Sequence, residues 1–118
     1  MMFSSELAKL DCAVALERLG GDEELLREVA GLFLDEYPIL MSEIRTAVVA
    51  GDADSLQRAA HSMKGSVSNF GADGVYQAAF ELEKKGRAGD LATLQPCIDE
   101  LACALENIHP ALVVLARV

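Results

Sequence analysis

The sequence of 118 residues has no tryptophan, few other aromatic residues and few basic residues. Its aromatic residues are two tyrosines and four phenylalanines, and β-branched residues are also sparse, which disfavours an extensive β-sheet. Ten lysines and arginines face nineteen aspartates and glutamates, so the formal net charge is −9. A chain with this charge and no basic stripe repels a nucleic-acid backbone or an anionic membrane at long range. We therefore expect neither a nucleic acid nor a membrane as a partner.

Cysteine and long apolar runs are scarce as well. Cys12, Cys97 and Cys103 are odd in number and form no C-x-x-C pair, so the sequence suggests neither a disulfide framework nor a zinc site. The apolar run Ala111–Ala116 is far too short to span a bilayer, and the first ten residues lack the basic start and apolar stretch of a signal peptide. We expect a protein of the reducing cytoplasm that has no metal or other cofactor of its own.

Hydrophobic residues make up 52% of the chain, which is enough for one domain over residues 1–118 with a single shared core. Their spacing is helical nearly everywhere and predicts an all-α fold. Short connections favour an up-down antiparallel four-helix bundle, with one or two additional short N-terminal helices. The first three expected helices run from near Asp11 to the break at Gly20 and Gly21, from an Asp22 cap to about Leu34, and from Tyr37 to Ala50 with Pro38 in the first turn. The next two run from an Asp52 cap to about Asn69 and from Asp73 to Lys85, before a turn at Gly86 and Gly89. The last runs from Leu91 to Leu115.

Pro96 and Pro110 fall within the last of these helices. The stripe of leucine and isoleucine from Leu91 to Leu115 keeps its phase across both prolines. We therefore expect bends or a frayed end at these positions and no change of element.

The segment from Gln57 to Ala72 contains a histidine on the polar side of a predicted helix. At about 100° per residue, His61 lies roughly 140° from the centre of the apolar face and should be exposed. The residues of that face are Leu56, Ala60, Met63, Val67 and Phe70. A lone histidine is ordinarily a surface or core residue without chemistry, so its meaning depends on its neighbours.

Five residues neighbour His61 on the helix surface, at three and four positions before it and three, four and seven after it. They are Gln57, Arg58, Lys64, Gly65 and Ser68. A glycine inside an exposed helix is about 1 kcal/mol less favourable than alanine, so Gly65 should have a compensating purpose. One interpretation is clearance, which opens the imidazole to a bulky partner; the other is close packing against a helix, or a kink.

Lys64 and Ser68 each have a functional and an ordinary interpretation. The Lys64 ammonium can neutralise part of the charge of about −1.5 to −2 on a phosphoryl group attached to the ring, or it can be a solvated lysine. The Ser68 hydroxyl can bond a phosphoryl oxygen or its own helix. An exposed imidazole is largely neutral at cytoplasmic pH and needs no base to become a nucleophile, and phosphoryl transfer relies mainly on positioning and charge neutralisation.

This segment resembles the signature of histidine-containing phosphotransfer (HPt) domains, which is close to A-H-x-L-K-G-x(5)-G-A. Here it is Ala60-His61-Ser62-Met63-Lys64-Gly65, followed after five residues by Gly71-Ala72. Met63 replaces the usual leucine. The similarity extends over most of the chain, including the segments around Leu10, around Gly21 to Leu25, at Ala50 to Asp52 and at Leu82 and Glu83.

The resemblance implies a phosphorelay intermediate with a four-helix core. His61 would accept a phosphoryl group, at the ring nitrogen remote from the main chain, from a phospho-aspartate of a receiver domain. It would pass the group to an aspartate of another response regulator. The partners would be receiver domains of response regulators or of a hybrid histidine kinase, the Mg²⁺ would belong to the receiver's acidic pocket, and the carrier would be a monomer.

Two other function classes are compatible with a histidine in a helical bundle. An autophosphorylating histidine kinase is disfavoured, because Ser62 follows His61 where such kinases resemble H-E-x-x-R/P and because a glycine-rich nucleotide-binding segment is lacking. We therefore expect a phosphocarrier without kinase activity. A helical docking module that binds receiver domains without phosphotransfer remains open. The second histidine, His109, lacks a neighbouring glycine and lysine, and we expect it to be structural or incidental.

Overall fold

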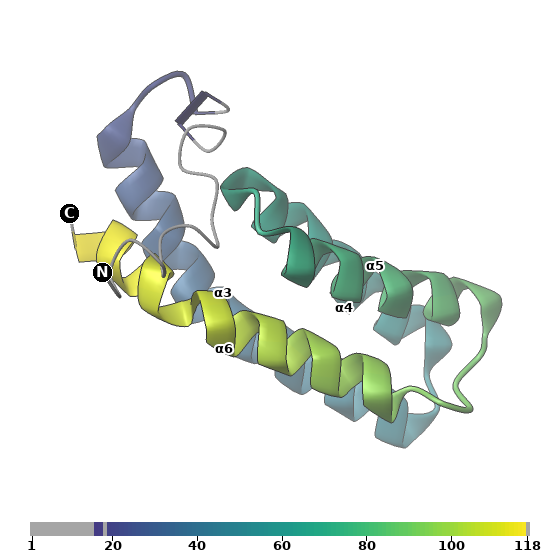
Figure 1. The fold of residues 1–118 in the computed structure, drawn as a ribbon. Helices are drawn as coiled ribbons and strands as arrows, with labels where there is room; N and C mark the ends of the chain where they lie inside the picture. The colour runs from purple at the N-terminus through teal and green to yellow at the C-terminus, as the bar shows by residue number, and fades with distance from the viewer. Residues whose placement is uncertain (1–15, 18, 118) are drawn as a thin grey trace.

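The computed structural model describes residues 16–17 and 19–117, and every regular element in them is a helix (Figure 1). The main elements are α3 (Glu23–Ala50), α4 (Ala53–Val67), the short 3-10 helix η1 (Ser68–Phe70), α5 (Asp73–Ala88) and α6 (Gln95–Arg117). The all-α prediction is confirmed. The expected first short helix from near Asp11 lies mostly outside the described residues, where only Leu16 and Glu17 are seen as helical.

The predicted helix ends at Asp22, Gly51 and Asp52 are present. The carboxylate of Asp22 accepts a hydrogen bond from the backbone N–H of Leu25, and that of Asp52 accepts one from Ser55, so both satisfy helix N–H groups that lack an intrahelical partner. Gly51 ends α3 with φ at 67°, a left-handed conformation that favours glycine. These local signals account for the short α3–α4 connection.

The predicted break between Leu34 and Tyr37 is wrong, because α3 continues through Pro38 as one helix of 28 residues. A proline inside a helix removes one hydrogen bond and destabilises it by about 3 kcal/mol. Buried apolar side chains continue in phase on both sides of Pro38, at Phe33 before it and Leu40 after it. This continuous burial offsets the local penalty, so the expected second N-terminal helix is the first part of α3.

Helices α5 and α6 also differ from the prediction at their boundaries. Gly86, expected in a turn, lies inside α5, which ends at Ala88 before the left-handed Gly89. Helix α6 begins at Gln95, so Pro96 occupies its first turn, where its missing N–H is not needed. Pro110 lies inside α6, which continues to Arg117, so the element does not change there, as expected.

The four helices form an up-down antiparallel bundle. Each packs against the next in sequence, and α6 closes the ring against α3. Figure 1 shows α3 and α6 side by side along one side of the molecule and the α4–α5 pair along the other. None of the helices in the described part of the chain is long and apolar enough to cross a membrane.

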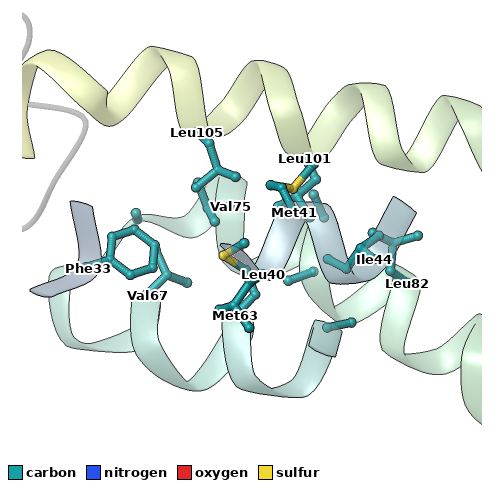
Figure 2. Packing of buried hydrophobic residues seen from close by; sticks show 14 of the residues in the cluster. Phe33, Leu40, Met41, Ile44, Met63, Val67, Val75, Leu82, Leu101 and Leu105 are labelled. Atoms are coloured by element: carbon teal, nitrogen blue, oxygen red, sulfur yellow. The ribbon is translucent and has the colours of Figure 1, made fainter. Parts of the chain in front are cut away.

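Apolar side chains from all four helices meet in one core (Figure 2). The face predicted for α4 is buried, with Leu56, Ala60, Met63, Val67 and Phe70 all at 0% exposure. Because this side of α4 is held in the core, the opposite side faces outward along the whole helix.

The packing of the core predicts that replacing a buried leucine destabilises the protein more than replacing an exposed one. Leu101 is fully buried, whereas Leu32 is 65% exposed. We expect Leu101→Ala to lower the free energy of unfolding by about 2–5 kcal/mol, because it removes a packed side chain and leaves a cavity. Leu32→Ala should change it by no more than about 0.5 kcal/mol. Urea denaturation of both variants checks this, and equal effects would contradict the packing described.

Candidate functional site

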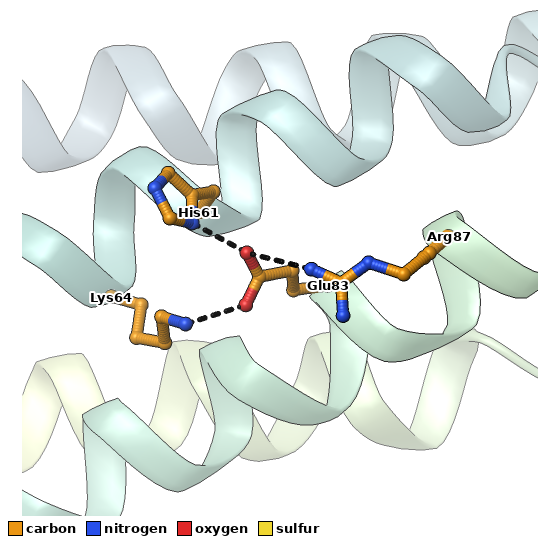
Figure 3. A network of polar contacts seen from close by, with 4 residues as sticks. All are labelled: His61, Lys64, Glu83 and Arg87. Atoms are coloured by element: carbon orange, nitrogen blue, oxygen red, sulfur yellow. Dashed lines mark hydrogen bonds and ion pairs between the residues drawn. The ribbon is translucent and has the colours of Figure 1, made fainter.

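His61 lies on the outward side of α4, and its side chain is 67% exposed. This agrees with the helical wheel, which separates His61 from the buried face. One edge of the ring nevertheless has a partner inside the protein, because Nδ1 lies 2.5 Å from Oε2 of Glu83 on α5. Figure 3 shows the imidazole and the carboxylate pointing toward one another across the two helices.

The contact with Glu83 determines which ring nitrogen of His61 carries the proton. Three basic or donor side chains surround the Glu83 carboxylate, which is 2% exposed. Burial alone would raise its pKa, but hydrogen bonds and charges from Lys64 and His61 outweigh burial and hold the pKa below its ordinary value. An ionised carboxylate only accepts hydrogen bonds. In the neutral ring, Nδ1 therefore donates to Glu83, and Nε2 keeps its lone pair.

Lys64 and Arg87 complete the cluster around Glu83. The ammonium of Lys64 lies 2.7 Å from Oε1 of Glu83, and the guanidinium of Arg87 lies 3.6 Å from Oε2. Lys64 is 18% exposed, whereas Arg87 is 61% exposed. Two positive groups are thus held beside His61 by one buried negative group.

Aromatic rings further restrict the position of Lys64. Its Nζ lies 4.8 Å from the centroid of the Phe80 ring and 5.9 Å from that of Tyr76. An ammonium over an aromatic face is stabilised by the ring quadrupole. Lys64 is therefore not the freely solvated lysine that the sequence left open.

Gly65 lies on the exposed side of α4 beside His61. A Cβ built on Gly65 meets nothing within 4 Å in the described structure beyond its chain neighbours and its own helix backbone. This excludes the packing interpretation for contacts with the described residues and leaves the space next to the imidazole open.

The other three residues singled out from the sequence are Ser68, Arg58 and Gln57. Ser68 donates its hydroxyl to the carbonyl oxygen of Gly65 at 2.7 Å, which is the bond to its own helix. The guanidinium of Arg58 donates to the hydroxyl of Ser55. Gln57, Arg58 and His61 line a shallow hollow on the surface. The other residues of this hollow are Asp54, Ser62, Glu83 and Arg87.

Sequence reasoning missed Glu83 and Arg87 as residues of the site. A signal for Glu83 was present, because it falls in the three-and-four spacing of the buried face of α5 with Ala79 and Gly86. A carboxylate on such a face requires a partner. Arg87 gave no comparable signal, since an arginine on the exposed side of a helix is ordinary.

His109 belongs to a different part of the bundle. Its Nδ1 lies 2.6 Å from the hydroxyl of Tyr37, and the rings meet edge to face. Burial, followed by the charge of Glu106, raises the pKa of Tyr37. This contact joins α6 to α3, as the structural interpretation of His109 expects.

No group of three or more metal-binding side chains comes together within residues 16–17 and 19–117.

The chain is similar in sequence to proteins of one family. The model of the family described as "Hpt domain" matches residues 28–111. The phosphorelay protein LuxU of Vibrio cholerae serotype O1 is 25% identical over 87 residues, which cover 74% of this chain and 77% of LuxU.

Two solved structures have the same fold. One is the histidine-containing phosphotransfer protein B (HptB) of Pseudomonas aeruginosa PAO1, with a TM-score of 0.83 and 25% identity over 92% of this chain and 94% of HptB. The other is the HPT domain of a sensor hybrid histidine kinase from Shewanella, with a TM-score of 0.80 and 23% identity over 95% of this chain and 97% of that domain. Members of this family interact with receiver domains in phosphorelays. With its exposed histidine on the second helix of a four-helix bundle, the chain belongs to the Hpt domain family and is a phosphotransfer protein of a phosphorelay, a phosphocarrier like LuxU.

Proposed function

We propose that Nε2 of His61 accepts a phosphoryl group from the phospho-aspartate of a receiver domain and transfers it to an aspartate of another response regulator. One observation carries this proposal: the exposed imidazole has its Nδ1 held by the buried Glu83 carboxylate, so its Nε2 lone pair faces outward. A neutral imidazole in this tautomer needs no base to attack.

The proposed step balances without any further reactant. The Nε2 lone pair forms a bond to phosphorus, the bond between phosphorus and the aspartate oxygen breaks, and the aspartate leaves as a carboxylate. Since Nδ1 keeps its proton, the ring becomes positively charged. Glu83 already accepts a hydrogen bond from Nδ1 and so stabilises this positive ring. In the second transfer, an aspartate carboxylate of the other response regulator attacks phosphorus, and the ring leaves as a neutral imidazole.

Within this chain, Lys64 and Arg87 are the side chains that neutralise part of the negative charge of the phosphoryl group. The Lys64 ammonium has three donors and uses one on Glu83, which leaves donors for a phosphoryl oxygen. Arg87 is exposed and lies on the same hollow as His61. The receiver supplies the remaining countercharge through the Mg²⁺ in its own acidic pocket, because phosphoryl transfer depends on charge neutralisation from both sides.

The remaining sequence candidates are assigned to partner contact. The open space over Gly65 admits the rim of a receiver's active site next to the imidazole. Gln57 and Arg58 line the surface that such a partner covers. Ser68 lies with Lys64 and Gly65 beside a neighbouring hollow. Its hydroxyl bonds its own helix and would have to rotate away from the Gly65 carbonyl to donate to a phosphoryl oxygen. The free thiols of Cys97 and Cys103 fit a reducing compartment, and we place the reaction in the cytoplasm.

The first prediction from the proposed function separates a phosphocarrier from a docking module. Incubation with receiver domains phosphorylated by acetyl phosphate and Mg²⁺ should give a phosphoryl group on the wild-type chain that is labile in acid and stable in alkali. His61→Gln should bind the same receivers without becoming labelled, whereas labelled ATP alone should label neither protein. Binding of the wild type without any labelling, across all receivers of the source organism, would support the docking module instead.

The second prediction concerns Glu83 and pH. Because its pKa is lowered in the fold, the Glu83 carboxylate stabilises the protein above the ordinary glutamate pKa of 4.5, and this contribution is lost as the pH falls through the lowered pKa. Glu83→Gln should lower the free energy of unfolding by about 1–3 kcal/mol at pH 7. The difference from the wild type should shrink progressively below pH 4.5.

Urea denaturation at a series of pH values measures this difference. The matched control is Glu81→Gln on the same helix, since Glu81 is half exposed and pairs with Lys84 on the surface, where an ion pair contributes little. A difference for Glu83→Gln that is independent of pH, or equal to that of Glu81→Gln, would contradict the role given to the buried carboxylate.

The third prediction concerns the space over Gly65. Gly65→Gln should slow transfer from a phosphorylated receiver by about tenfold or more, since misplacement of reacting groups by about 1 Å has effects of this size. The variant should remain as stable as the wild type, because the added side chain meets open space. Gly31→Gln, at another open helical position, should leave transfer unchanged. A loss of stability with unchanged transfer would show that Gly65 is a packing residue.

A further inference from the structure

We propose that Gly86 is a positioning residue that sets the distance between α4 and α5 and thereby holds the Glu83 carboxylate against His61. This inference rests on the proposed function, because it concerns the tautomer that makes Nε2 the nucleophile. Gly86 is buried in α5, and the nearest atoms that a Cβ at this position would meet belong to Gln57 and Ala53 of α4.

The backbones of α4 and α5 lie close together where Gly86 faces α4. A Cβ added to Gly86 would lie 2.9 Å from the backbone nitrogen of Gln57, 3.0 Å from its Cα and 3.1 Å from the carbonyl oxygen of Ala53. All three atoms belong to helix backbone, which cannot rotate aside as a flexible side chain can. The other glycines inside the described helices differ, since Gly31 and Gly65 meet open space and Gly74 meets only ordinary contact at 3.8 Å.

This contact is adjacent to the His61–Glu83 pair on both helices. Gly86 follows Glu83 by three residues, and Gln57 precedes His61 by four, which is about one helical turn in each case. Because α4 and α5 are antiparallel neighbours, these two steps run in the same direction in space. The Gly86–Gln57 contact and the Glu83–His61 contact are thus one helical turn apart on the same α4–α5 interface. The distance between the helices at the first contact therefore determines the distance at the second.

The required spacing is narrow. Ordinary contact begins at 3.4 Å, so a Cβ at position 86 would push the helices apart by about 0.5 Å, the difference from 2.9 Å. The carboxylate of Glu83 has to reach His61 and Lys64 at the same time, at 2.5 Å and 2.7 Å. Hydrogen bonds weaken as these distances grow, so a small separation weakens both contacts together.

The test is Gly86→Ala, with the tautomer of His61 as readout. Ring ¹⁵N shifts at about pH 8.5, where imidazoles are neutral, report the ratio of the Nδ1–H to the Nε2–H form without any partner protein. We expect this ratio to fall about threefold, which corresponds to losing part of one charge-assisted hydrogen bond. Transfer from a phosphorylated receiver should slow in parallel.

Two controls separate positioning from general destabilisation. Gly74→Ala makes the same change on the same helix at a position with room, and Leu101→Ala destabilises the core away from the α4–α5 contact. Both should keep the wild-type tautomer ratio. If Gly86→Ala also keeps that ratio, or if Leu101→Ala changes it equally, the proposal is wrong.

A double variant shows whether Gly86 acts through Glu83. In Glu83→Gln the amide can either accept from Nδ1 or donate to it, so the tautomer preference should be lost. Adding Gly86→Ala to Glu83→Gln should then cause no further change in the ratio. A further change would mean that Gly86 affects His61 by another route and would overturn the proposal.

Glu83→Asp tests the spacing if Gly86→Ala fails to fold. With the helix distance held by Gly86, a carboxylate shorter by one methylene cannot reach His61, and the tautomer ratio should match that of Glu83→Gln. Retention of the wild-type ratio would show that the helices close the gap and that position 86 does not set the distance. Failure of the proposed function would be seen in a different experiment, as the absence of phosphotransfer to the wild-type protein.

Discussion

A single buried carboxylate, that of Glu83, connects the exposed imidazole of His61 to two positively charged side chains. A carboxylate that is 2% exposed is unfavourable without partners, and here Nδ1 of His61, Lys64 and Arg87 surround it. Since an ionised carboxylate only accepts hydrogen bonds, the same contact that satisfies Glu83 also orients the imidazole and selects its tautomer. The result is an exposed imidazole with positive groups beside it, and this arrangement is already formed in the chain alone.

This arrangement depends on the close approach of α4 and α5, the most extensive contact between any two helices of the described bundle. Small residues are buried on both helices, including Ala60 on α4 and Ala79 on α5, and Gly86 faces the α4 backbone. Small side chains let helix axes come near each other. A site built across such a contact uses the rigidity of packed backbone, and the role proposed for His61 requires one ring nitrogen in a defined orientation.

The long helices α3 and α6 have a different part in the structure. They carry Pro38 and Pro110 in their interiors, yet each continues as one element because its apolar face packs along the bundle. They contribute no residue to the His61 cluster. Their burial holds the inner face of α4 in the core, and this is what turns His61 outward. The scaffold and the site are therefore linked through the rotation of α4 about its own axis.

Local patterns in the amino-acid sequence were enough to predict the helical fold, the capped start of α4 at Asp52 and the buried and exposed faces of that helix. They also identified His61 as the outward histidine. These features follow from local spacing and from helix geometry, which involve residues within a few turns of one another. The continuity of α3 across Pro38 could not be predicted, because it depends on burial against other helices. The interior position of Gly86 and the partners of Glu83 could not be predicted either, since they arise only when two antiparallel helices meet in one register. Which atoms of α4 and α5 come together, and hence which nitrogen of His61 faces outward, was decided by tertiary structure, because hydrogen bonds between helices form only at distances that packing fixes.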